Sequence, residues 1–482
     1  MTDKNIGLTI KLQDKSEDVK IFVKIRRKKY MKKILMALAG AVMFASAAFA
    51  EELTLMIYAQ PQEKAILDKV IARFEATHKG TKVKFISSTQ NEYDAKIQAQ
   101  LAANNLPDVF YLGPGGVRQY VDNKKVLDLS PYVKGVAGAN FEDLYESAVD
   151  TYRYDGKELG KGNAIWALPK DFGPFAFAYN KTLFEKYKIP LPSKDKPYTW
   201  QEFIDVCEKL TKDTNGDGQN DTFGTGLNIH WAFIQFVWGN GADFLDPSHT
   251  KVTVSDPKFV EALQYWANMT LGNSDFPVSG LSKFKPVTPT ATQAQSLDTY
   301  QRWIKGELGF FPAGPWDLAK FNDPEVIKFE YDLIPWPVHT SANQTATYRG
   351  GVGYAVAANS KNPKLAAELA LYLSADEEAN KMYSDMDLQI PNLKSLATRY
   401  TSKPGKPANR QEYINIISKT GRAWPSDYTY NSVWYDKFYM GIQKVLDGKM
   451  SAKDYCTKIQ PQMQRELDKA LQRAKQSAAR NK

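Results

Sequence analysis

Apolar residues recur with two different periods after position 50, and the two periods alternate. Residues 52–58 and 81–87 are short β-prone runs, whereas residues 63–77 carry apolar side chains at helical spacing. A second helical pattern, at 93–104, precedes a third strand-like run at 107–112. Strands that alternate with helices through short links favour a parallel sheet covered by helices. The expected fold class is therefore α/β.

The rest of the chain continues this mixture of extended and helical segments. Two apolar runs that contain Pro or Gly, 165–180 and 348–357, are predicted to be extended because proline breaks a helix. Residues 401–411 are rich in Pro, Gly and Lys, which is typical of a loop. Helical periodicity predicts further helices at 200–212, 231–238, 256–271, 293–305, 363–373, 433–446 and 452–478.

The first fifty residues contain the pattern of an export signal. Met31-Lys32-Lys33 begins a basic region, residues 34–45 are apolar, and Ala48-Phe49-Ala50 supplies a small-residue cleavage site. The apolar run is too short for a membrane span. We expect a signal peptide at 31–50, and residues 1–30 to be an extension upstream of the true start. Because Glu51 follows the cleavage site where a lipid anchor needs Cys, we expect a secreted, soluble periplasmic protein.

Length and charge narrow the function classes. The 482 residues, 43% of them hydrophobic, can form two or three domains. The net charge of +9 would suggest an anionic partner, but residues 1–50 hold 11 basic and 4 acidic residues. The remainder has 52 basic and 50 acidic residues, a net charge of +2, so nucleic acid is not an expected partner. Cys207 and Cys456 could pair after export, but two buried free thiols are the simpler expectation.

Four ordered motifs carry a family resemblance. They are Pro107-Asp-Val-Phe110, Leu168-Pro169 followed by Phe177-Ala-Tyr-Asn-Lys-Thr-Leu-Phe-Glu185, Gly314-Pro-Trp316, and the segment 359–370. Together with the signal peptide, and over nearly all of 51–482, they resemble the family of extracellular solute-binding proteins that includes the maltose-binding protein. The resemblance implies an ABC importer's substrate-binding protein that carries a sugar or oligosaccharide.

The same resemblance implies a two-lobe periplasmic-binding-protein clamp of type II. Each lobe would be a mostly parallel sheet flanked by helices, and both lobes would be discontinuous. The three expected crossings between lobes lie near Trp166–Phe172, Arg349–Gly353 and Ala423–Asp427. The implied boundaries give 51–168 and 351–423 to lobe 1, and 169–350 and 424–482 to lobe 2.

A clamp of this kind works by domain closure, in which a ligand that touches both lobes favours the closed form. The implied partners are a carbohydrate ligand and the permease subunits of an ABC transporter in the inner membrane. We expect a monomer that requires no cofactor.

Aromatic side chains are the first candidates for sugar recognition, because flat rings stack on the apolar face of a sugar. The chain has 12% aromatic residues and ten Trp. By motif, Trp316 and Trp434 match positions where the maltose-binding protein stacks sugar rings. Trp231 and Trp424 are two further candidates. Ordinary core packing is the alternative for each of these residues.

Polar candidates lie near the predicted crossings and strand ends. Lys170 and Asp171 form a charged pair among apolar residues, so they need either a ligand or each other as an ion pair at the hinge. Ligands of α/β sheets bind beyond the carboxyl ends of strands, which makes Gln60, Gln90 and Gly115 candidates by position. Two weaker candidates complete the set of ligand-binding residues, Asn240 and Arg349.

One loop has the spacing of a calcium site. Residues 213–221 place oxygen-bearing side chains at relative positions 1, 3, 5 and 9, with Gly at position 6. The twelfth position is Gly224 where a calcium loop has Glu. A structural calcium ion and a plain Asp/Asn/Gly-rich turn both stay open. The candidate ligands are Asp213, Asn215, Asp217, Gln219 and Asp221.

Two competing interpretations remain. An exported polysaccharide-active enzyme would be equally rich in aromatic residues, but no carboxylate pair stands in a recognisable catalytic motif, and neither His-Glu-x-x-His nor Gly-x-Ser-x-Gly occurs. We therefore expect no catalytic residues. The other interpretation keeps the clamp and changes its cargo to a polyol phosphate, a polyamine, a peptide or a metal. The near-neutral charge of the mature chain argues against strongly charged cargo.

Overall fold

The structure is a computed structural model that describes residues 10–11, 22–23 and 51–480, with no side chains described at 10–11, 22–23 and 478–480. The predicted signal peptide lies outside these ranges. Of the predicted extension only two short antiparallel strands are described, β1 (Ile10–Lys11) and β2 (Phe22–Val23). The chain divides into two units, residues 1–52 with 79–82 and residues 53–78 with 83–482. The strands at 51–58 and 81–88 each begin with two residues of the smaller unit, and the other elements described below lie in the larger unit.

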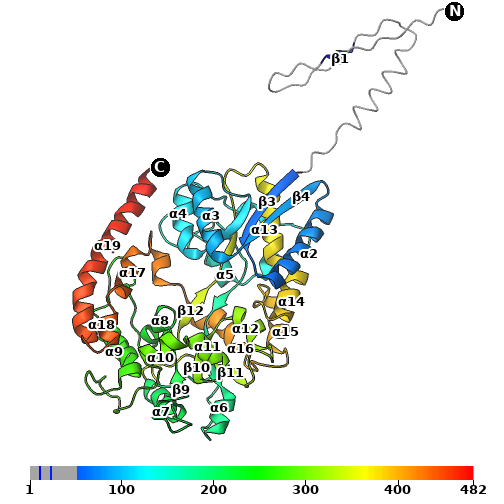
Figure 1. Cartoon of the computed structure of the whole chain (residues 1–482). Coiled ribbons are helices and arrows are strands. Elements are labelled where there is room, and N and C mark those ends of the chain that lie inside the picture. The colour runs from blue at the N-terminus through cyan, green and yellow to red at the C-terminus, as the bar shows by residue number, and fades with distance from the viewer. Residues whose placement is uncertain (1–9, 12–21, 24–50, 481–482) are drawn as a thin grey trace, which may run out of the picture. The chain divides into compact units, whose positions relative to one another are not determined.

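A five-stranded sheet organises the first part of this unit (Figure 1). Strands β3 and β5 are parallel, whereas β13 is antiparallel to both β5 and β6. We call this sheet, together with the helices that pack on it, the five-stranded part. The order of the strands is β4 (Thr81–Ser88), β3 (Glu51–Tyr58), β5 (Val109–Leu112), β13 (Gly353–Val356) and β6 (Leu168–Pro169).

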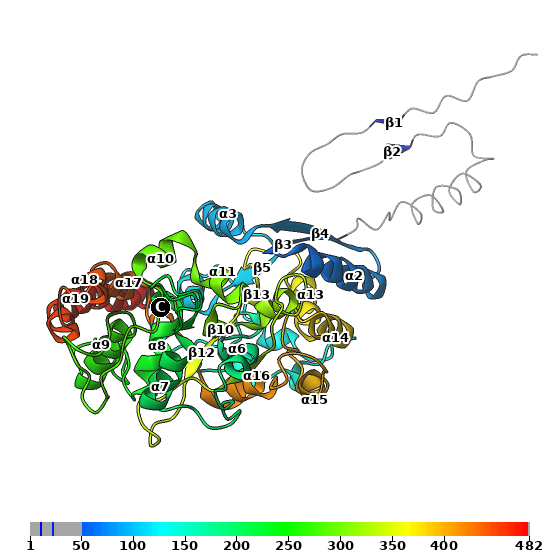
Figure 2. The ribbon, with the colours of Figure 1, turned by 60° about the horizontal axis from the view of Figure 1, so that its bottom comes forward.

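Helices of the five-stranded part follow the predicted periodicity. Helix α2 (Pro61–Thr77) begins with Pro at its first position and a capping box between Gln60 and Glu63, and the apolar face predicted from the sequence is the face it buries. Helices α2, α13 and α14 pack together (Figure 2). The helices of this part are α2, α3 (Gln90–Ala102), α4 (Val117–Asp122), α5 (Glu146–Asp150), α13 (Pro363–Ala375) and α14 (Glu377–Asp385).

A four-stranded sheet organises the second part, which we call the four-stranded part. Strand β10 is antiparallel to β8 and parallel to β9, and β11 is antiparallel to β8. The order is β11 (Tyr331–Ile334), β8 (Ala176–Asn180), β10 (Leu308–Ala313) and β9 (Phe223–Thr225). Its helices include α6 (Lys181–Lys186), α7 (Trp200–Leu210), α8 (Ile229–Gly239), α9 (Pro257–Leu271), α12 (Leu318–Phe321) and α16 (Gln411–Asn415).

Two predicted helices are each divided in two. The helix predicted at 293–305 is α10 (Ala291–Ser296) and α11 (Thr299–Ile304), because Asp298 accepts the Gln301 amide and caps a new helix. The helix predicted at 433–446 is α17 (Val433–Tyr439) and α18 (Gln443–Leu446). The last helix, α19 (Ala452–Arg480), packs with α17 and α9 (Figure 2).

The sheets are mixed and not mostly parallel as predicted. Two strands that are consecutive in the chain can lie parallel in one sheet only if a crossover segment returns the chain to the same end of that sheet. Strand β13 instead enters its sheet after the chain has passed through the four-stranded part, and it pairs antiparallel on both sides. In the four-stranded part, β8 and β11 run against their neighbours.

A small three-stranded sheet holds together the chain segments next to the predicted crossings. Strand β12 (Thr347–Gly350) pairs antiparallel with β7 (Gly173–Pro174) and parallel with β14 (Gly421–Arg422). Each strand comes from a different passage of the chain, so three passages that are far apart in sequence lie side by side. We call this sheet the hinge sheet.

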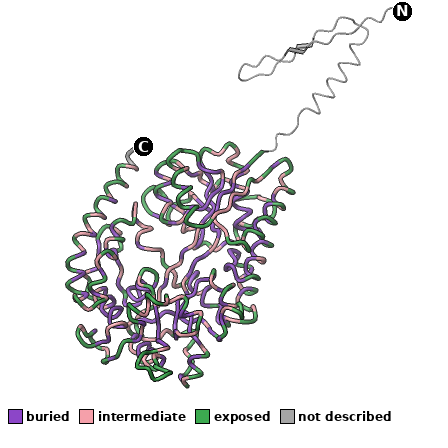
Figure 3. The backbone as a smooth tube through the Cα atoms, viewed as in Figure 1, coloured by how far each residue is buried: buried purple, intermediate pink, exposed green. Residues whose placement is uncertain are grey.

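Buried residues form separate cores in the two parts (Figure 3). The core of the five-stranded part joins residues 53–168 to residues 354–396. Tyr413, Ile416 and Ile417 pack with residues of β8 and β10, although the predicted boundary places residues as far as 423 in lobe 1. The exact domain boundaries stay a prediction. Cys207 and Cys456 are both buried and unpaired, as expected.

Candidate functional site

Five aromatic side chains form a continuous surface beside the hinge sheet, which we call the aromatic platform. The ring centroid of Phe175 lies 5.3 Å from that of Trp316, 6.1 Å from that of Trp231 and 6.3 Å from that of Tyr348. Trp424 extends the platform, with its ring centroid 4.9 Å from that of Tyr348 and 6.3 Å from that of Trp231. The rings come from five segments that the fold brings to one place.

Two rings of the platform remain open to solvent. Trp231 is 53% exposed and Trp316 is 41% exposed, whereas Trp200, Trp303 and Trp336 are fully buried. Large apolar rings grouped at a surface mark a binding site more often than single exposed ones, so two exposed indoles on one aromatic platform indicate a binding surface.

Local structure fixes the position of Trp316. The short 3-10 helix η5 (Pro315–Asp317) begins with Pro, and the Gly314 amide donates a hydrogen bond of 3.0 Å to the Asp317 carboxylate. Burial raises the pKa of Asp317 to about 6. A side chain at Gly173 would come within 3.2 Å of both the Trp316 ring and the Gly350 carbonyl carbon. The indole therefore lies directly over the hinge sheet.

A buried ion cluster lies next to the hinge sheet. The Lys170 ammonium is 2.9 Å from a Glu63 oxygen and 2.8 Å from an Asp171 oxygen, and the second Asp171 oxygen accepts the Val352 amide at 3.2 Å. Burial alone would lower the pKa of Lys170, but the charges of Asp171 and Glu63 hold it well above its ordinary value. A Cβ on Gly351, whose φ is +138°, would lie 2.4 Å from the Asp171 carbonyl oxygen. Only glycine allows this approach.

One carboxylate touches both parts of the molecule. An Asp427 oxygen accepts the Trp424 amide at 3.2 Å, while the other oxygen lies 3.0 Å from the place a Cβ of Gly115 would take. Burial raises the pKa of Asp427 to about 7. Burial, followed by the charges of Asp427 and Asp171, also raises the pKa of Tyr348. The Tyr348 phenol is therefore within electrostatic range of both carboxylates.

The structure brings several predicted residues together. Trp316, Trp231 and Trp424 all belong to the aromatic platform, and Gly115 faces Asp427. Lys170 and Asp171 form an ion pair, which is one of the two roles that the sequence predicts for them. Gln60 lies near the ion cluster, since its backbone amide donates to Glu63 at 3.0 Å. Gln90 is exposed at the first position of α3, away from these contacts.

Two predicted ligand residues, Trp434 and Asn240, have structural roles instead, and a third, Arg349, is engaged only in part. Trp434 is fully buried and its indole N–H donates to Thr429 at 2.9 Å, so neither face can stack on a ligand. Asn240 is buried at the end of α8 and donates to the Lys258 carbonyl and to Glu261, both at 2.8 Å. Arg349 donates to the Ile417 carbonyl at 3.2 Å, burial lowers its pKa, and its buried Nε has no partner among the described residues, so a ligand role for Arg349 stays a prediction.

Sequence reasoning missed Phe175, Tyr348, Glu63 and Asp427. Phe175 and Tyr348 lie inside the two extended runs that were predicted next to crossings, so aromatic residues in those runs were the available signal. Asp427 is the last residue of the third predicted crossing, so its position beside a crossing was the available signal. Glu63 stands three residues after Gln60, a capping-box spacing that explains its place but not its contact with Lys170.

The candidate calcium loop is folded around backbone amides. Asp213 accepts the amides of Gly216 at 2.6 Å and Gly218 at 2.8 Å, and Asp221 accepts from the Asn215 side chain at 3.0 Å. Within the described part of the chain, no group of three or more His, Cys, Asp or Glu side chains could hold a metal ion. Asn, Gln or backbone oxygens would have to complete a calcium shell, and calcium binding stays a prediction.

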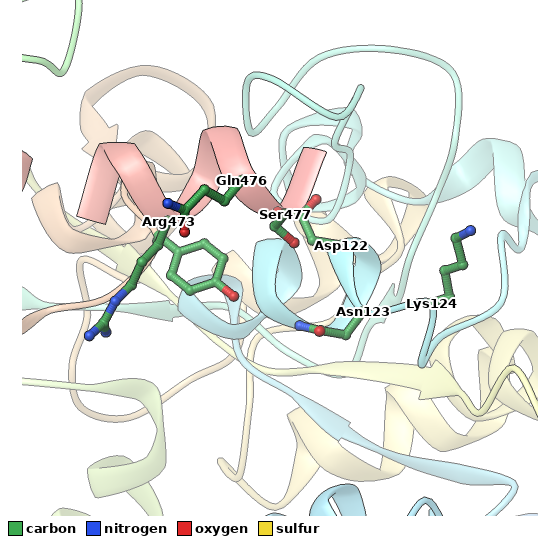
Figure 4. Close-up of a pocket in the computed structure, with 7 residues that line it drawn as sticks. Asp122, Asn123, Lys124, Arg473, Gln476 and Ser477 are labelled. Atoms are coloured by element: carbon green, nitrogen blue, oxygen red, sulfur yellow. The ribbon is translucent and has the colours of Figure 1, made fainter. Parts of the chain in front are cut away.

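A separate polar pocket of about 300 Å³ lies between the end of α4 and the last turns of α19 (Figure 4). None of the predicted ligand residues lines it. Its lining is Asp122, Asn123, Lys124, Tyr430, Arg473, Gln476 and Ser477. The pocket joins the five-stranded part to the C-terminal helix but has no exposed indole.

Solved structures share this architecture. The ABC substrate-binding protein Lmo0181 from Listeria monocytogenes, in complex with cycloalternan, superposes with a TM-score of 0.70 at 22% identity, covering 87% of this chain and 99% of that one. The maltose/maltodextrin-binding domain MalE from Bdellovibrio bacteriovorus gives a TM-score of 0.62 at 16% identity, covering 86% and 100%. The fold is therefore the two-lobe clamp of type II periplasmic binding proteins, and the five-stranded and four-stranded parts correspond to its lobes 1 and 2.

Sequence comparison gives the same family. The diacetylchitobiose-binding protein DasA of Streptomyces coelicolor is 28% identical over 348 residues, which cover 69% of this chain and 72% of DasA. These relatives are binding proteins rather than enzymes. No helix in the described residues is long and apolar enough to cross a membrane. Because the family model matches residues 58–380, the chain belongs to the bacterial extracellular solute-binding proteins.

Proposed function

We propose that this protein binds a sugar or oligosaccharide between its lobes and delivers it to the permease of an ABC importer. The observation that carries the proposal is the aromatic platform, where two indoles are exposed and one of them, that of Trp316, lies over the hinge sheet. Ring faces offer a sugar the apolar surface that its C–H groups need, and nearby carboxylates offer acceptors for its hydroxyl groups.

The relatives support a carbohydrate as ligand. Besides DasA, they include the maltodextrin-binding protein MdxE and the melibiose/raffinose/stachyose-binding protein MelE, both of Bacillus subtilis. Trp316 and Trp231 both contact Phe175, so their faces are separated by one aromatic ring. A ligand that stacks on both indoles needs more than one sugar ring, which favours an oligosaccharide.

Domain closure supplies the transport step. The hinge sheet joins the three passages between lobes, and Trp316 packs directly on it. A ligand that contacts both lobes stabilises the closed form by its difference in affinity for the two forms. On this proposal the protein is a monomeric periplasmic carrier with no catalytic step, and the permease reads the closed form.

Calorimetric titration with diacetylchitobiose, maltotriose and raffinose tests the proposal, with chromatography of the sugar afterwards. We expect one of them to bind and to be recovered intact. Ligand at 100 times its Kd should also stabilise the fold by about 2.7 kcal/mol. Cleavage of the sugar would contradict a pure carrier. Binding of glycerophosphocholine, named for one structural neighbour, with no binding of any sugar would favour the polyol-phosphate alternative.

Trp316→Ala should weaken sugar binding. Burying one indole face contributes about 1.5 to 3 kcal/mol, so the loss of affinity should be roughly tenfold or more. Leu191→Ala is the matched control, because Leu191 is 46% exposed and lies outside the platform. Equal affinities of the two variants would contradict stacking on Trp316.

A further inference from the structure

We propose that the solvent face of helix α19 is a docking surface for an anionic phospholipid bilayer. Four cations line this face, and we call them the basic stripe: Lys458, Arg465, Lys469 and Arg473. The basic stripe lies outside the aromatic platform. The choice of partner rests on the proposed function, because a carrier that serves an importer works at a membrane surface.

The basic stripe follows the repeat of the helix. Its members are separated by seven, four and four residues, and this spacing keeps side chains on one face. At 1.5 Å per residue, the stripe extends for roughly 22 Å along α19. All four side chains are exposed, and the buried side chains of α19 lie on another face of the helix. These buried residues include Cys456, Ile459, Met463, Leu467 and Ala470.

Most of the charge of the basic stripe is not neutralised within the protein. Lys469 pairs with Glu466 at 2.9 Å. Lys458, Arg465 and Arg473 form no ion pair with any residue that the structure describes. Arg473 also lines the polar pocket, but Figure 4 shows its guanidinium directed away from the other labelled side chains. Three cations are therefore free to meet an anionic partner.

Net charge is distributed unevenly along the mature chain. Residues 433–482 hold 11 basic and 5 acidic residues, whereas residues 51–432 hold 41 basic and 45 acidic residues. Within α19 itself, seven basic residues outnumber three acidic ones. An anionic plane therefore attracts the C-terminal helices and repels the rest of the molecule, which directs α19 toward that plane.

The composition of this face favours lipid headgroups over a protein partner. The centres of protein interfaces are rich in aromatic residues and depleted in Lys. Among the exposed positions of α19 from 453 to 476, only Pro461 is apolar. A row of cations without an apolar centre suits a plane of phosphate groups, since each Lys or Arg near such a plane gains electrostatic free energy. Docking of this kind inserts no side chain and is therefore released by salt.

Co-sedimentation of the mature protein with lipid vesicles tests the proposal. The probes are vesicles of phosphatidylcholine alone and of phosphatidylcholine with about 30% phosphatidylglycerol, each at about 50 mM and about 500 mM NaCl. We expect binding to the anionic vesicles at low salt and release of the protein at high salt. Binding to the neutral vesicles should be weaker by about tenfold or more.

A charge-reversal variant locates the docking surface. Combining Lys458→Glu, Arg465→Glu and Arg473→Glu should weaken binding to anionic vesicles by about tenfold or more and leave the affinity for sugar unchanged. The matched control reverses three exposed lysines elsewhere in the described chain, so the net charge changes equally. It should bind the anionic vesicles about fivefold more tightly than the stripe variant, or better. The control combines Lys134→Glu, Lys161→Glu and Lys283→Glu.

Each result is decisive. Absence of binding to anionic vesicles, or equal binding to neutral ones, overturns the proposal with wild-type protein alone, so a folding defect in a variant cannot hide it. Equal weakening in the two variants overturns it too, because net charge and not α19 would then govern binding. Retention on heparin–agarose without vesicle binding replaces the bilayer by a soluble polyanion. A protein that docks on anionic vesicles but binds no sugar keeps the docking surface and refutes only the carrier function.

Discussion

Single residues in this protein show how burial changes a charged group. Glu412 is only 3% exposed, and its nearest side-chain donor is the Asn415 amide at a long 3.4 Å. Burial raises the pKa of Glu412 from 4.5 to about 7. The folded state therefore holds this proton more tightly than the unfolded state does between pH 4.5 and 7.

Glu412→Gln should stabilise the protein more at pH 8 than at pH 5. Wild-type stability from this group falls as pH rises through the window from 4.5 to 7, because ionising a buried carboxyl costs free energy. The neutral Gln variant has no carboxyl to ionise, so its free energy of unfolding should exceed that of the wild type by on the order of 2 kcal/mol at pH 8. Urea unfolding at both pH values measures it. Exposed Glu325→Gln is the control, and a gain independent of pH would refute the argument.

Trp434 and Trp316 show what a motif can and cannot predict at this scale. Both match stacking positions of the family, but only Trp316 keeps an exposed face, whereas Trp434 is part of the core. The motif fixes the place of a residue along the chain. Whether its side chain is exposed depends on tertiary contacts, which no local sequence pattern predicts. For Trp434 these contacts are with Thr429 and Tyr435.

At the scale of elements, regular periodicity was enough to predict most helices and three strands of the first sheet. It failed where a single polar residue interrupts a pattern, as Asp298 does between α10 and α11. It also failed on strand direction, because the direction of β13 depends on the route of the chain through the other lobe. The hinge sheet could not be predicted, since its strands of two to four residues are too short to carry a period.

The connection beside the hinge sheet leads to a stability prediction. Gly351→Ala would place a Cβ 2.4 Å from the Asp171 carbonyl oxygen and should cost about 3 kcal/mol or more. Gly280→Ala is the matched control, because Gly280 also has a positive φ, +80°, but nothing within 4 Å of the added atom. It should cost roughly 1 kcal/mol. Similar losses in urea unfolding would show that backbone conformation alone decides the effect.

The candidate calcium loop makes a prediction that separates its two interpretations. If calcium binds, 1 mM calcium at about 100 times Kd should stabilise the wild type by about 2.7 kcal/mol, and Asp217→Asn should lose that gain. Thermal unfolding in calcium and in EDTA measures the difference. Identical curves for the wild type in both conditions would identify the loop as a plain turn.

At the scale of the whole molecule, the two lobes meet where Asp427 faces Gly115. Gly115→Val should hold the lobes apart, because the added side chain would take the space of the carboxylate. We expect a larger radius of gyration in X-ray scattering and weaker sugar binding. Gly113→Val is the control, since a Cβ there meets nothing within 4 Å. Identical scattering of both variants would contradict a closure contact at Gly115.

The two thiols have a practical consequence at this scale. Cys207 and Cys456 are fully buried in lobe 2, and burial raises the pKa of both, that of Cys456 to about 12. Thiol-reactive dyes attack the thiolate of accessible cysteines, so neither native cysteine will take up label while the protein is folded. A single cysteine introduced on the rim of lobe 1 would thus carry the only fluorophore. Lobe closure on ligand binding should change the surroundings of that fluorophore and hence its emission. Because no native cysteine would be labelled, the protein is suited to an optical sensor of its own ligand.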